Sequence, residues 1–286
     1  YTFTFSNVGE EESTLEYEIY SSPFLNPLGL DDSGNLWTSS DSESEFNWID
    51  ISDNSTLINF SNNDEASGTI PIGFEFPFYG NNYQECSINP NGWLGFGGDS
   101  DEWENTQIPS STILNAAMFP FWDDLNPVNN GCNQYCSGEV YYYSSPELFV
   151  ITFDQVAHWW TNFENSYYSF QVVMYPSGKF YFNYLNLEGD FSSSTIGIQN
   201  ENATDGILMS FNSSSLIENN FSIFVSQLPE WIDIENGQGQ LPYGQSTTET
   251  ITLDASNLEG GLYNGYLIIN TNDADLNIPI ALTVNE

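Results

Sequence analysis

The chain has 286 residues with 40 Asp or Glu, one Lys and one His, so its formal net charge is −39. One basic residue cannot neutralise a nucleic-acid backbone or bind an anionic membrane surface, and no lysine-bearing phosphate loop is present. Because aromatic residues make up 16% and apolar residues 40% of the chain, it is predicted to fold rather than to form a disordered acidic tail. No apolar run approaches the length of a membrane-spanning helix, so direct membrane insertion is not expected.

Runs of β-forming residues recur along the chain and are separated by short, turn-rich stretches. The runs are Leu15–Tyr20, Ile70–Tyr79, Cys86–Phe96, Val140–Tyr143, Leu148–Phe153, Tyr168–Tyr175, Phe180–Tyr184, Thr195–Ile198, Phe221–Val225, Thr250–Leu253, Gly265–Ile269 and Ile278–Val284. One short helix candidate, Ser111–Ala117, ends before Pro120. The pattern predicts an all-β protein made of sandwiches.

Two breaks divide the chain into a long middle segment and two flanks. Residues 21–45 are rich in Ser, Asp, Gly and Pro and are predicted to be a linker, and a second break lies near Ser226–Pro229. The flanks are residues 1–20 and 227–286. Because the chain begins directly on a strand pattern, we expect it to be a fragment, a mature product or one unit of a longer polypeptide.

The two flanks carry motifs that together correspond to a single module. These motifs are Phe3–Gly9, Leu15–Ile19, Pro229–Ile234, Thr248–Ala255, Leu258–Gly265, Leu267–Asp273 and Ile278–Val284. In this order they resemble the immunoglobulin-like repeats of HYDIN/ASPM type in bacterial surface proteins. The resemblance implies one Ig-like β-sandwich, split between residues 1–20 and 227–286 and lacking its usual first strand.

The middle segment, residues 46–226, contains a second ordered series of motifs. They are Ile70–Gly80, Ile88–Phe96, Phe119–Leu125, Gly138–Tyr142, Phe149–Asp154, Phe170–Tyr175, Gly178–Tyr184 and Thr195–Gln199. The series resembles the nidogen-like β domain of extracellular and bacterial cell-surface proteins. The resemblance implies a larger β-sandwich inserted into the split one, with an adhesion or matrix role and no shared catalytic centre.

Residues that could support catalysis do not form a recognisable catalytic set. Asp32-Ser33-Gly34 has the sequence of half an aspartic-protease site, but that chemistry needs two such triplets and the chain has no second one. His158 follows a predicted strand without a Ser or Cys nucleophile motif, which favours a packed or rim histidine over a general base. We therefore expect no enzymatic activity.

Two oxygen-rich stretches are candidates for calcium binding. Asp31, Asp32 and Asn35 form one of them, although the twelve-residue EF-hand pattern is absent. Asp123 and Asp124 form the other, within the nidogen-like Trp-Asp-Asp-Leu motif. Their carboxylates either pin a turn by hydrogen bonding or bind calcium, and no other cofactor is expected.

Two further features of the sequence are its three cysteines and its N-glycosylation motifs. Cys132 and Cys136 lie in a short loop flanked by glycine, where a disulfide worth about 2 kcal/mol is predicted and zinc binding is the rival interpretation. Cys86 is predicted to be a buried free thiol. Candidate sites of N-glycosylation are Asn54, Asn59, Asn202, Asn212 and Asn220.

The functional hypothesis is a structural repeat or subunit of an extracellular bacterial surface filament or giant adhesin. Copies of the chain would join head to tail by β-strand complementation, because an incomplete sandwich leaves an open sheet edge. The residues expected to carry assembly are Tyr1, Phe3, Phe5, Ile278, Ile280, Leu282 and Val284. The alternative is a glycan- or matrix-binding module of a secreted multidomain protein, and a third hypothesis is an accessory region of a secreted hydrolase. Halophilic adaptation would explain the charge but not the order of the domains.

Overall fold

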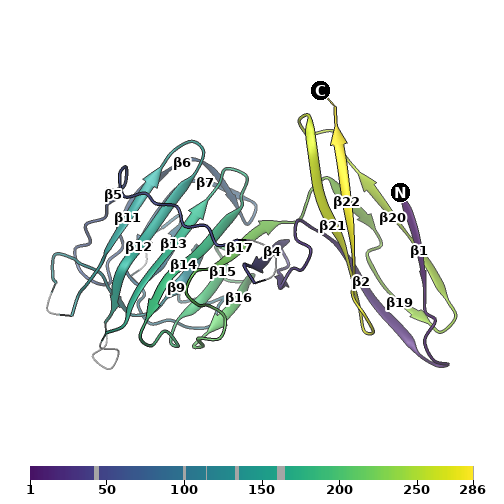
Figure 1. Ribbon diagram of the computed structural model, residues 1–286, viewed down its shortest axis with the longest axis horizontal. Helices are drawn as coiled ribbons and strands as arrows, with labels where there is room; N and C mark the ends of the chain where they lie inside the picture. Colours follow the sequence, from purple (N-terminus) through teal and green to yellow (C-terminus); the bar gives the residue numbers. More distant parts are fainter. Residues whose placement is uncertain (42–44, 99–100, 114, 133–134, 160–164, 286) are drawn as a thin grey trace. The chain divides into compact units, whose positions relative to one another are not determined.

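The computed structural model spans the chain and describes all residues except 42–44, 99–100, 114, 133–134, 160–164 and 286 (Figure 1). The described residues form an all-β protein that divides into two compact units. Unit 1 combines Tyr1–Leu28 with Gln227–Glu286, and unit 2 is Gly29–Ser226. The described part of the chain contains no helix long and apolar enough to cross a membrane.

The larger sheet of unit 2 contains nine strands among the described residues, in the order β3-β4-β17-β14-β13-β12-β11-β5, with β10 paired to β12. Their bounds are β3 Gly29–Leu30, β4 Asn35–Ser39, β17 Phe221–Gln227, β14 Phe180–Glu188, β13 Tyr167–Met174, β12 Phe149–His158, β11 Glu139–Ser144, β5 Thr56–Leu57 and β10 Leu125–Asn126. Consecutive strands β11 to β14 pair antiparallel, as expected for segments joined by short turns.

The second sheet of unit 2 has the order β16-β15-β9-β8-β7-β6. Its strands are β16 Gly206–Phe211, β15 Thr195–Gln199, β9 Ala116–Trp122, β8 Trp93–Phe96, β7 Asn81–Asn89 and β6 Thr69–Phe78. Buried side chains of both sheets form one core, in which Phe76 contacts Phe180 across the sandwich and Phe153 stacks on Phe170. Aromatic packing on this scale supplies the apolar burial that a highly charged chain needs.

Two stretches differ from the sequence expectations. The described residues of Ser111–Ala117 form no helix: a turn joins Ser110 to Ile113, and strand β9 begins at Ala116. β9 is buried along its whole length between β8 and β15, so tertiary packing overrides the helix preference of its alanines. Within residues 21–45, the stretch expected to be a linker, β4 pairs with the large sheet and buries Leu36 and Trp37.

Unit 1 consists of two sheets packed on a smaller core. One sheet has the order β1-β20-β18 and the other β19-β2-β21-β22. The strands are β1 Thr2–Ser6, β20 Ser246–Leu253, β18 Ile232–Glu235, β19 Gln238–Pro242, β2 Thr14–Ser22, β21 Gly261–Thr271 and β22 Leu276–Val284. The core includes Ile19, Trp231, Ile251 and Leu267, which come from both sheets and from both ends of the chain.

Candidate functional site

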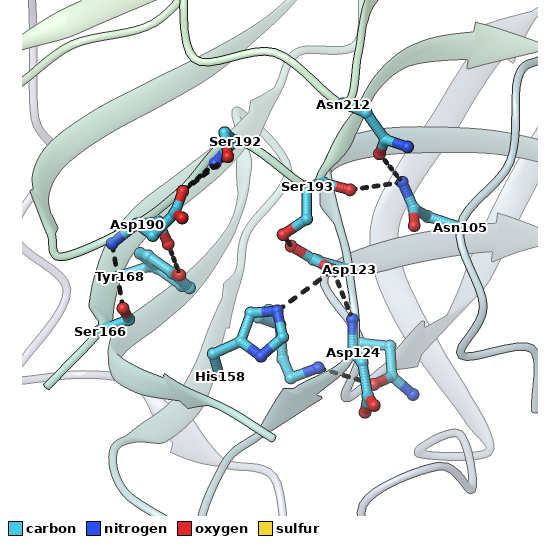
Figure 2. Close-up of polar contacts among 12 residues, drawn as sticks. Asn105, Asp123, Asp124, His158, Ser166, Tyr168, Asp190, Ser192, Ser193 and Asn212 are labelled. Carbon is cyan, nitrogen blue, oxygen red and sulfur yellow. Dashed lines mark hydrogen bonds and ion pairs between the residues drawn. The ribbon is translucent and has the colours of Figure 1, made fainter. Parts of the chain in front are cut away.

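A buried polar cluster lies where the chain passes from β9 in one sheet of unit 2 to β10 in the other (Figure 2). Asp123 and Asp124 occupy this crossing, and β10 pairs with β12 so that Leu125 lies opposite His158. The crossing packs against the turn between β7 and β8, which needs Gly92: its φ is +79°, and an added Cβ would lie 1.9 Å from the carbonyl oxygen of Phe121. Backbone packing therefore constrains the positions of both aspartates independently of their side-chain contacts.

Asp123 is 4% exposed, and both of its carboxylate oxygens contact neighbouring groups. Ser193 Oγ donates to Oδ2 at 2.6 Å, the Asp124 amide donates to Oδ1 at 3.0 Å, and His158 Nε2 lies 3.4 Å from Oδ1. Figure 2 shows Asp123 contacting its neighbour Asp124 and two other segments, which carry Ser193 and His158. Asp123 thus pins the crossing and the loop that carries Ser193.

The Asp124 carboxylate differs from its neighbour because no described residue donates a hydrogen bond to it. In Figure 2 it points away from the Asp123 carboxylate. The backbone carbonyl oxygen of Asp124 accepts a bond from the Trp159 amide at 2.8 Å. Burial raises the pKa of the Asp124 carboxyl to about 7; His158 opposes the rise, and the negative charges of Asp64 and Asp123 add to it. Asp124 is therefore a half-buried acid that can change its charge near neutral pH.

The loop facing this cluster is fixed by a second set of contacts. Asn105 Nδ2 donates to the carbonyl oxygen of Ser193 at 2.6 Å and to Asn212 Oδ1 at 3.0 Å. Tyr168 donates to the carbonyl oxygen of Asp190. These bonds hold Ser193 in place beside Asp123, so the cluster is a rigid part of the sandwich end rather than a mobile loop.

Most of unit 2, including its Trp-Asp-Asp-Leu crossing, lies within a segment that matches a known family. The family model described as "NIDO related" matches residues 37–241. The chain belongs to this nidogen-related family. Searches of the curated proteins and of the solved structures found no match. The nidogen-like interpretation of the sequence is thereby confirmed, and the match extends from β4 into β19.

In the nidogen-related chain, the other calcium candidate is a turn that is held by hydrogen bonds within itself and to other segments. The buried Asp31 carboxylate accepts bonds from the Asn35 amide at 2.8 Å, from Asn35 Nδ2 at 2.9 Å and from the Tyr79 hydroxyl at 2.7 Å. Burial raises the pKa of Asp31, and these donors oppose the rise. The Asp32 amide donates to Asp205 Oδ1 at 3.3 Å. The described residues contain no group of three or more His, Cys, Asp or Glu side chains that could hold a metal ion.

The disulfide and the asparagines of the glycosylation motifs lie on the surface of the nidogen-related chain, whereas the third cysteine is buried. A disulfide joins Cys132 and Cys136, whose Cα atoms are 5.7 Å apart. Cys86 is a buried free cysteine on β7, where burial raises the pKa of its thiol. All five asparagines of the glycosylation motifs are exposed: Asn54, Asn59, Asn202, Asn212 and Asn220. Their side chains are accessible to a modifying enzyme.

The residues expected to carry assembly lie on two edge strands of unit 1, and the structure brings four of them together. A groove of about 300 Å³ between β1 and β22 is lined by Tyr1, Phe3, Ile278 and Ile280, together with core residues such as Ile251 and Leu267. The other three do not line it: Phe5 packs on Tyr17, Leu282 packs against the unit 1 core, and Val284 ends β22.

Sequence reasoning missed a polar ladder on the large sheet. Thr152, Gln171, Asn183 and Ser222 are buried on four neighbouring strands. Gln171 Nε2 donates to Thr152 Oγ1 at 2.9 Å, Asn183 Nδ2 donates to Gln171 Oε1 at 3.3 Å, and Ser222 Oγ donates to Asn183 Oδ1 at 2.6 Å. The available signal was a polar residue inside each of four apolar strands.

Proposed function

We propose that this nidogen-related protein is a structural subunit or repeat of an extracellular bacterial surface filament or large adhesin. Copies join head to tail, each accepting a strand of its neighbour at unit 1, which acts as an Ig-like repeat of HYDIN/ASPM type. No catalytic activity is part of the proposal. Residues of unit 2 then form the outward surface, on which the five exposed asparagines would carry glycans.

The observation that supports this proposal most is the groove between β1 and β22. These strands are edges of the two sheets of unit 1, and each pairs with one neighbour among the described residues. Leu276 and Ile278 on β22 are large apolar side chains that remain exposed. An incoming strand would bond to the free edge of β22 and place alternate side chains in the groove.

The distribution of charge also favours contact between copies at this edge. Strands β1, β21 and β22 contain no charged residue, although the chain carries 40 Asp or Glu. Two copies with a formal net charge of −39 repel one another wherever their acidic faces meet. A charge-free edge is therefore the part of unit 1 where another copy approaches at least electrostatic cost.

One feature limits how much of the edge can accept a strand. Pro279 has no N–H, and proline in an edge strand is accommodated with its nitrogen facing solvent. Ala281, two residues further along, directs its N–H the same way because strand geometry repeats every two residues. The segment from Ala281 to Val284 is therefore the stretch of β22 best able to pair with an incoming strand.

The test is the assembly state of the purified protein, measured by light scattering after size exclusion and by negative-stain microscopy. Wild type is expected to form filaments or a ladder of oligomers. Ala281→Pro removes an outward donor, and Ile278→Asp adds a charge to the groove, so both should yield monomers. Val8→Asp, at an 86% exposed residue of unit 1 outside the groove, is the matched control and should assemble. Dispersed wild-type monomers, or filaments of both edge variants, would contradict the proposal.

A second candidate function is a glycan- or matrix-binding module without self-assembly. It is favoured if wild type stays monomeric at every concentration and binds an immobilised polysaccharide or matrix. A groove on unit 2, beside residues 46–52, bears on it independently of β22.

A further inference from the structure

A segment of unit 2, residues 46–52, crosses the outer face of the large sheet and is called here the strap. In Figure 1 this dark segment runs across the strands from β17 to β11. The Ile49 amide donates to Gln171 Oε1 at 3.2 Å, and Gln171 Nε2 donates back to the Ile49 carbonyl oxygen at 2.8 Å. Asn183 Nδ2 donates to the carbonyl oxygen of Asn47 at 3.0 Å. The polar ladder thus ties the strap to the sheet.

These anchors make the strap a fixed wall. Gln171 and Asn183 are 0% and 2% exposed, and detachment of the strap would remove three hydrogen bonds that these two amides make with it. The loss of these bonds opposes detachment. Ile51 adds apolar contact, because it packs with Val150 and Val173 on the same face. Anything that binds beside the strap therefore meets a preformed surface.

A groove of about 370 Å³ lies beside the strap. It is lined by Trp48, Asp50 and Ser52 of the strap and by Tyr141, Thr152 and Asp154 of the sheet. Trp48 and Tyr141 are half-buried, whereas Asp50, Ser52 and Asp154 are exposed. The lining therefore combines two aromatic rings with hydroxyl groups and two carboxylates.

Both carboxylates are exposed acceptors that a ligand can reach. Asp50 Oδ1 accepts the Ser52 amide at 3.0 Å, and this bond lowers the pKa of Asp50, which stays ionised. Asp154 Oδ1 accepts Ser169 Oγ at 3.1 Å. The Ser52 side chain also acts on the Asp50 carboxylate, whereas Ser169 is the one described residue that donates a hydrogen bond to the Asp154 carboxylate. Two exposed carboxylate acceptors beside aromatic rings suit a ligand that has both hydroxyl donors and apolar ring faces.

We propose that this groove binds a neutral polysaccharide. A sugar ring presents an apolar face to Trp48 and Tyr141, and its hydroxyls donate to Asp50 and Asp154. Anionic glycans are rejected because the lining holds two negative charges and no cation. A basic peptide would also satisfy the carboxylates, but the hydroxyls of Ser52 and Thr152 match a sugar better than an ammonium group. This inference does not depend on assembly at β22.

The test is calorimetric titration of the full chain with cellohexaose, maltohexaose and mannohexaose, with oligogalacturonate and a lysine oligopeptide as contrasting probes. At least one neutral oligosaccharide should bind wild type, with quenching of tryptophan fluorescence. Trp48→Ala should weaken binding at least tenfold and Asp154→Asn several-fold. Trp103→Ala removes an exposed tryptophan outside this groove and should leave binding unchanged.

Three results would overturn the proposal. They are no binding of any neutral oligosaccharide at millimolar concentration, equal binding by wild type and Trp48→Ala, and binding of the lysine oligopeptide alone. Circular dichroism melts confirm that each variant is folded. If Trp48→Ala does not fold, Asp154→Asn decides the outcome, because Asp154 is exposed and lies outside the core.

Discussion

Replacement of Asp124 by asparagine should stabilise the protein at neutral pH and have little effect at pH 4. The folded-state pKa of Asp124 is about 7 and lies above its ordinary value of 3.8. The stability that this group contributes is therefore fully present below the unfolded pKa and is lost as the pH rises through the folded pKa. Asparagine resembles the protonated acid, so Asp124→Asn keeps that stability at pH 8.

The magnitude follows from the size of the shift. A difference of about three pKa units corresponds to about 4 kcal/mol if the group were fully shielded from water. Asp124 is partly solvent-exposed, so screening reduces this figure, and we expect a gain of about 1–2 kcal/mol at pH 8. At pH 4, where the folded protein holds Asp124 protonated, the difference should be close to zero.

The assay is urea unfolding of wild type and Asp124→Asn at intervals from pH 4 to pH 8. Comparison at each pH removes the contribution of the other carboxylates, which both proteins share. Asp123→Asn is the control, because it breaks contacts to Ser193 and His158 and should destabilise the protein at every pH. A variant that is less stable than wild type at pH 8, or equally stable across the range, would refute the reasoning.

Two further predictions concern the same crossing. If calcium binds at Asp124, millimolar calcium at pH 8 should raise the melting temperature of wild type and have a smaller effect on Asp124→Asn, with reversal by a chelator; equal shifts would argue against this site. Gly92→Ala should cost at least 3 kcal/mol in urea unfolding, because its Cβ would clash with a backbone carbonyl. Gly244→Ala has a similar φ of +74° with nothing within 4 Å, so a loss of about 1 kcal/mol is expected, and equal losses would contradict the steric argument.

The strands that sequence patterns located well are those with long apolar or alternating runs. The predicted run Ile278–Val284 corresponds to β22, Leu276–Val284, and the run Ile70–Tyr79 corresponds to β6, Thr69–Phe78. β4 was missed because its Leu36 and Trp37 stand in a stretch of Ser, Asp and Gly that reads as a loop. Its strand character comes from pairing with β17, which begins at Phe221 far along the chain.

The candidate site shows the same limit. The Trp-Asp-Asp-Leu motif drew attention to Asp123 and Asp124, and both lie in the polar cluster. The pairing of Asp123 with His158 depends on the register of β10 against β12, which local patterns do not specify. The different environments of the two neighbouring aspartates depend on donors such as Ser193, which arrives from a distant loop. The sequence therefore indicated which residues could take part in the chemistry of the site, but it did not indicate which partners the fold brings to them.

The discontinuity of unit 1 has a consequence for biosynthesis. The side chains of Thr4 and Thr248 are hydrogen-bonded although 244 residues separate them, so β1 emerges from the ribosome long before its partner strand exists. Unit 2 can complete its own sandwich in the meantime, and in doing so it bonds the Ser40 amide to the Ser222 carbonyl oxygen at 2.9 Å. That bond joins a segment near the start of unit 2 to one near its end, so the folded unit shortens the effective loop that the split module must close. Folded unit 2 therefore holds the two halves of the split module close together once both are synthesised. Until then, the earlier half remains unpaired in the nascent chain.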